Sequence, residues 1–104
     1  MAKHKDVVFL VTTDAEGKAE VDSPRPLSGR VTKIEYITDN RIPFEPTVSF
    51  RFIGATSGNA IHIAADVDDR AKWQPAGRLN DEPIKVIVAG GGKGRSGSFH
   101  VTTE

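Results

Sequence analysis

Short runs of β-branched and aromatic residues, separated by Gly, Pro, Asn and Asp, make up most of this chain. Residues 47–53 alternate most clearly and place Val48, Phe50 and Phe52 on one side, which is the two-residue period of a half-buried strand. No segment has a sustained apolar stripe of helical period. The pattern therefore predicts an all-β chain of about seven strands, at 7–12, 18–22, 27–37, 47–53, 60–64, 84–89 and 97–102.

Turn-forming residues between these runs suggest how the strands connect. Turns at 14–17, 54–59 and 90–96 would each join two consecutive strands into a hairpin. Residues 27–37 would form one crossing strand, in which Gly29 marks a bulge or a close approach of another backbone segment. Three hairpins and a crossing strand are typical of an antiparallel β-sandwich or a jelly-roll-like barrel.

Alternation also predicts which side chains face the core. Ile34 and Tyr36 share a face of their strand and are expected inside, because the opposite face carries charged residues. In the strand at 60–64, we expect Ile61 and Ile63 to face inward. That arrangement would leave His62 on the outer face.

Residues 66–83 show no usable period and mix charges with Trp73 and Pro75. We interpret them as a long surface excursion that holds one short helical turn at most, and long ordered loops often carry contacts. The glycine-rich residues 90–97 are interpreted as a flexible hairpin tip that also suits an interface. The candidate partner-contact residues in these two segments are Trp73, Pro75, Arg78, Gly91, Lys93 and Arg95. A tryptophan in such a loop either covers the core or anchors a partner, and the sequence favours neither for Trp73.

Length and charge limit the classes of function. The 104 residues suit a single domain over 1–104, with 1–5 as a flexible N-terminal tail. Lys plus Arg and Asp plus Glu balance at 14 each, so no net positive field attracts nucleic acid. The longest early apolar run, 7–11, is far shorter than the roughly 20 residues of a membrane helix. We expect no nucleic-acid partner, no membrane partner and, without cysteine, synthesis in a reducing cytoplasm.

The motifs that resemble known chemical sites fail at essential positions. A phosphate loop needs a helix after its glycines and Ser or Thr after its lysine, but a strand follows and Gly94 occupies that position. A calcium loop starting at Asp66 would need Gly and Glu where Ala71 and Gly77 stand. The three histidines share no metal-ligand spacing, and no Gly-x-Ser-x-Gly element is present. We therefore expect no enzyme activity, no cofactor and no metal.

Three segments together are similar to a group of small tailed-bacteriophage virion proteins. They are Ser-Gly-Arg-Val-x-x-Ile-x-Tyr at 28–36, Val-Ser-Phe-Arg-Phe-Ile-Gly-x-x-Ser-Gly-x-x-Ile at 48–61, and Ile-Lys-Val-Ile-Val-Ala-Gly-Gly-Gly-x-x-x-Ser-Gly-Ser-Phe at 84–99. The resemblance covers residues 27–104, although 73–78 only approximates the aromatic-Pro-Arg segment usual in that group. It implies a structural role and offers no catalytic residues to transfer.

The leading hypothesis is a non-enzymatic virion structural protein, specifically a capsid decoration or cement protein. Its partners would be the major capsid protein or neighbouring virion proteins, and it would be a homo-oligomer, with a trimer favoured by the threefold sites of shell lattices. One alternative is a head-spike base or head-to-tail connector component. Another, of a different class, is a small ligand- or carbohydrate-binding β-domain, which would show aromatic side chains clustered around a groove.

Overall fold

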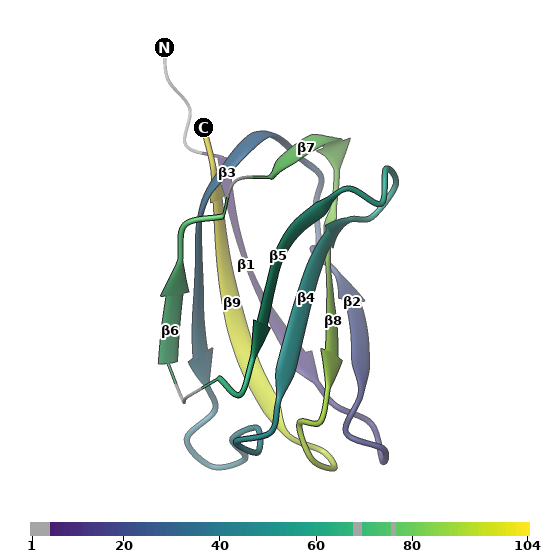
Figure 1. Cartoon of the computed structure of the whole chain (residues 1–104), viewed down its shortest axis with the longest axis vertical. Coiled ribbons are helices and arrows are strands. Elements are labelled where there is room, and N and C mark those ends of the chain that lie inside the picture. Colours follow the sequence, from purple (N-terminus) through teal and green to yellow (C-terminus); the bar gives the residue numbers. More distant parts are fainter. Residues whose placement is uncertain (1–4, 68–69, 76) are drawn as a thin grey trace.

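The computed structural model describes residues 5–67, 70–75 and 77–104, and this part of the chain contains nine strands and no helix (Figure 1). The predicted all-β sandwich is confirmed, with two more strands than expected. The strands are β1 (Lys5–Thr12), β2 (Ala19–Asp22), β3 (Leu27–Thr38), β4 (Ser49–Gly54), β5 (Ala60–Ala65), β6 (Arg70–Trp73), β7 (Arg78–Glu82), β8 (Ile84–Ala89) and β9 (Ser96–Thr103).

The strands form two facing antiparallel sheets. The first sheet has the order β1-β9-β3-β6, and β7 also pairs with β3. The second sheet has the order β2-β8-β4-β5. Figure 1 shows the two layers side by side, with strands of both sheets running along the long axis of the molecule.

Only one of the three predicted hairpins, β4–β5, is present. β1 pairs with β9 and β2 pairs with β8, so the first and last predicted hairpins are wrong. The connections at 13–18 and 90–95 instead cross between the sheets, and the Gly91 amide donates to the Gly17 carbonyl across 3.1 Å. Turn residues mark a change of direction in both cases, and they do not reveal whether the next strand joins the same sheet.

The predicted irregular excursion at 66–83 is also wrong in part, because it contains β6 and β7. Both strands pair with β3, which is 12 residues long and meets β7 near its start and β6 near its end. Exposed charged residues in β6 and β7 interrupt the alternation of apolar and polar residues by which a strand is predicted. The register of β3 against β7 shifts between Leu27 and Gly29, which confirms the predicted bulge.

Aromatic rings fill the space between the sheets. Phe50 lies at their centre, with ring centroids 4.8 Å from Tyr36 and 5.0 Å from Phe99. Phe52 and Phe44 extend this cluster to either side of Phe50. The predicted inward positions on β3 and β4 are confirmed, since Val48, Phe50, Phe52, Ile34 and Tyr36 are all buried.

The predicted faces of β5 are wrong from His62 onward. The register of β4 against β5 shifts between Phe52 and Ile53, so Phe52 lies opposite His62 whereas Ile53 lies opposite Ala60. Ile61 is the extra residue of this bulge and is buried. An extra residue reverses the alternation. His62 therefore faces inward, and the Ile63 side chain is 68% exposed on the outer face.

Candidate interaction surfaces

The described ranges contain neither a metal-ligand cluster nor a membrane-spanning helix. No three His, Asp or Glu side chains among those residues are grouped so that they could hold a metal ion. No helix in the same ranges is long and apolar enough to cross a membrane. The outer faces of the two sheets and their edges are the other candidate surfaces.

The outer face of the first sheet exposes large apolar side chains along β1. Val8 and Leu10 are each 62% exposed, and Ile37 on β3 is 45% exposed. The strand register places Leu10 and Ile37 in one cross-strand row, on either side of Ser98. Next to Val8 in the adjoining row, His100 on β9 forms a 2.8 Å contact with Asp6. This face thus places exposed apolar side chains on β1 and β3 beside polar side chains on β9, and protein contact surfaces contain both kinds of group.

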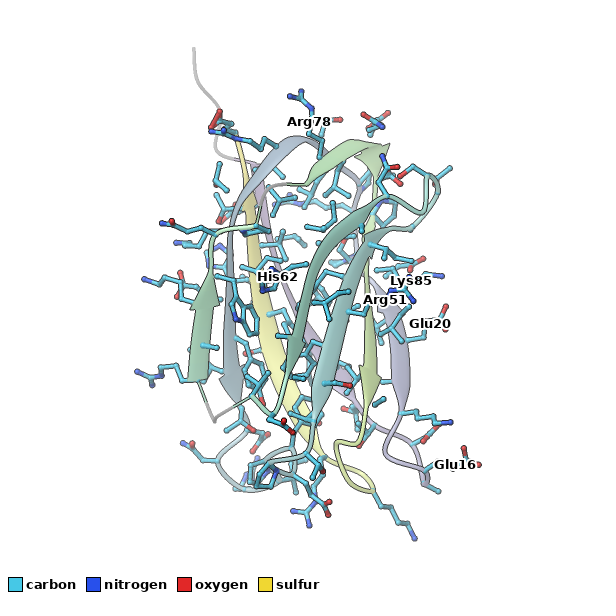
Figure 2. The ribbon with its side chains drawn as sticks, viewed as in Figure 1. Glu16, Glu20, Arg51, His62, Arg78 and Lys85 are labelled. Carbon is cyan, nitrogen blue, oxygen red and sulfur yellow. The ribbon has the colours of Figure 1, made fainter. Side chains whose placement is uncertain are left out.

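The outer face of the second sheet has a different pattern, in which apolar and charged side chains alternate along one row. The register aligns Ile63, Arg51, Ile87 and Glu20 in one row across all four strands. No ion pair joins Arg51 to another residue in the described part of the chain. Glu20 instead accepts from Lys85 at 3.0 Å, which Figure 2 shows beside Arg51. That hydrogen bond, with the charges of Asp22 and Glu20, raises the pKa of Lys85.

His62 and Trp73 close the sandwich where β5 of one sheet faces β6 of the other. Their ring centroids are 5.2 Å apart, and the Trp73 ring also lies 5.8 Å from Phe52. Figure 2 shows His62 directed from β5 toward the interior. Burial lowers the pKa of His62, because the charged imidazolium is poorly solvated there. The sequence alone missed this pair, since regular alternation placed His62 outside.

The six residues predicted as partner contacts do not form one surface. Trp73 is half-buried against the core, and Arg78 is exposed on β7, at the opposite end of the sandwich from the connection between β8 and β9 (Figures 1 and 2). That connection contains Lys93. Pro75 lines a shallow hollow with Gln74 and three residues of β3, and Arg95 is half-buried in the 90–95 connection.

Gly91 is buried in this structure, and its role as a contact residue stays a prediction. A β-carbon at Gly91 would lie 3.1 Å from both Phe44 and Thr13 side-chain atoms. The Thr13 hydroxyl donates to the Gly92 carbonyl and accepts from the Arg95 amide. These contacts fix the glycine-rich segment against the body of the sandwich, whereas the sequence indicated a flexible tip.

Comparisons with known proteins identify the class as a small β-sandwich protein. No family model matches the chain, and no curated protein matches it in sequence. Among solved structures, the crystal structure of FlhE is similar over 99% of both chains, with 12% identity and a TM-score of 0.56. The acidic stable capsid structure of Helicobacter pylori bacteriophage KHP30 matches 96% of this chain and 91% of that one, with 14% identity and a TM-score of 0.45. At these identities the FlhE likeness establishes a shared fold and nothing about activity.

Proposed function

We propose that this chain is a non-enzymatic virion structural protein that decorates or cements a phage capsid. The observation that carries the proposal is the exposure of Val8, Leu10 and Ile63 on the outer faces of two different sheets. Large apolar side chains on both faces suit a subunit that sits between neighbours. The similarity of residues 27–104 to small virion proteins of tailed phages supplies the biological setting.

The proposed mechanism is binding that favours the assembled shell. The partners would be the major capsid protein or neighbouring virion proteins, and no cofactor would take part. Apolar anchors such as Leu10 would enter the contact, while polar residues of β9 would form its hydrogen-bonding surroundings. A protein that binds assembled capsids and not their free subunits stabilises the shell by mass action.

The test is sedimentation velocity of the purified protein mixed with expanded capsids of its source phage. Wild-type protein is expected to co-sediment, and L10E is expected to bind at least tenfold more weakly, because it puts a charge at an apolar contact. The matched control N40E adds the same charge at an exposed loop position and should bind like wild type. No co-sedimentation of wild-type protein would overturn the proposal, and equal binding by L10E would exclude this face.

A further inference from the structure

The edges of the two sheets differ in how they are protected from pairing with other strands. Edge strands expose unpaired backbone groups, and natural proteins usually block them with charged residues or covering groups. On β1, the Arg25 guanidinium donates to the Asp6 carbonyl. Both outward-facing positions of β2 are acidic, and β6 and β7, which share an edge beside β3, carry several charged residues.

β5 is the exception among the described edges. Its sequence Ala-Ile-His-Ile-Ala-Ala contains no Asp, Glu, Lys, Arg or Pro, and it pairs only with β4. Gly77 lies against Ala60 and Ile61, and no other strand among the described residues pairs with β5 along its free edge. Ile63, near the middle of β5, is 68% exposed. An uncharged apolar edge of this kind is suited to receive another strand.

We propose that β5 pairs with β5 of a second copy of this chain, antiparallel and with the two-fold axis at Ile63. In that register Ile63 meets Ile63 on the outer face, and His62 of each copy lies opposite Ala64 of the other on the inner face. Each cross-strand pair is thus either apolar or a large residue beside a small one, and no like charges meet. A two-fold contact requires such self-complementarity, and β5 provides it.

The pairing would join two four-stranded sheets into one of eight strands. The row that contains Ile63, Arg51 and Ile87 would continue across the axis into the same row of the second copy. The added strand would also cover the open side of the His62–Trp73 contact. Because only a short edge is shared, the contact falls in the small, transient class and its strength should depend on protein concentration. Copies held close together on a larger assembly would pair more readily.

The first test is sedimentation velocity of the protein alone, at concentrations up to about 1 mM. Wild type is expected to form dimers, and I63K should weaken the dimer at least tenfold by placing two lysines against each other. L10K is the matched control, because Leu10 has similar exposure on an edge strand whose edge is partly capped. Wild-type protein that remains monomeric or forms trimers would overturn the proposal, as would an equal effect of L10K.

The second test uses the absence of cysteine from the chain, which makes an introduced thiol unique. I63C treated with a short bismaleimide should give covalent dimers, whereas L10C should give few. Both positions are exposed, so neither variant depends on repacking the core. Failure of I63C to cross-link under conditions where wild type dimerises would overturn the register. Neither test involves a virion, so their outcome is independent of the proposed capsid role.

Discussion

Glu82 is the buried charge on which one end of the fold depends, and its replacement by glutamine tests that dependence. The residue ends β7, and its side chain is 1% exposed. One carboxylate oxygen, Oε1, accepts from the amides of Thr56 at 2.9 Å and Ser57 at 2.8 Å. The other, Oε2, accepts from the amide of Asn80 at 2.9 Å. The carboxylate therefore fixes the β4–β5 turn to the strand that crosses toward the other sheet.

The structure sets the expected magnitude for E82Q. Glutamine can keep its single oxygen toward Thr56 and Ser57, but its amide group then faces the Asn80 amide, donor against donor. Losing one charge-assisted hydrogen bond and leaving its donor unsatisfied costs about 1.5–3 kcal/mol. E82A removes the acceptor for all three amides and leaves a cavity, so its cost should be larger, at about 3–5 kcal/mol.

Urea unfolding monitored by tryptophan fluorescence and circular dichroism measures these changes as a lower midpoint at constant slope. E16Q is the control, because the Glu16 side chain is 76% exposed and its loss should change stability by no more than about 0.5 kcal/mol.

The difference in unfolding free energy between E82Q and wild type should also depend on pH. Burial alone would raise the pKa of Glu82, but the amides of Ser57, Asn80 and Thr56 outweigh it and the pKa is lowered from 4.5. A lowered pKa stabilises the fold above pH 4.5, and this contribution is lost as the pH falls through the folded-state pKa. E82Q within about 0.5 kcal/mol of wild type at pH 7 would refute the role assigned to the carboxylate.

Two further predictions concern the sandwich interior. Because burial lowers the pKa of His62 from 6.5, the unfolded chain takes up a proton more readily than the folded one as the pH falls below 6.5. Wild-type stability should therefore decrease in that range, and H62Q should show a smaller decrease in parallel urea titrations; identical slopes would contradict the assignment. G97A places a β-carbon 2.6 Å from Tyr36 and 2.8 Å from Phe44 ring atoms, so overpacking should cost about 1–3 kcal/mol. A urea midpoint equal to wild type would show that these rings move aside freely.

Much of the fold could be predicted from alternation in the strands that face the core. The positions of Val48, Phe50 and Phe52 followed from their period, as did those of Ile34 and Tyr36. Strand pairing could not be predicted in the same way. The segments at 14–17 and 90–96 contain ordinary turn residues, and only the packing of two sheets decides that they cross between layers.

The outer face of β5 was harder to predict, because the residues that it exposes depend on one β-bulge. The bulge at Ile61 reverses the faces of the rest of β5, placing His62 beside Trp73 and Ile63 outside. No residue type in β5 indicates this bulge, whereas Gly29 indicates the one in β3. The exposure of Val8 and Leu10 could not be predicted for another reason. A continuous apolar run does not indicate which of its residues face outward.

The most direct test of the proposed function is the copy number of this protein in purified virions of the phage to which the proposal assigns it. Quantitative mass spectrometry can express that number relative to the major capsid protein. Copies in the hundreds per particle are the predicted result for a protein distributed over the shell. A few copies would assign it instead to a spike base or head-to-tail connector, and its absence from the particle would contradict the virion role.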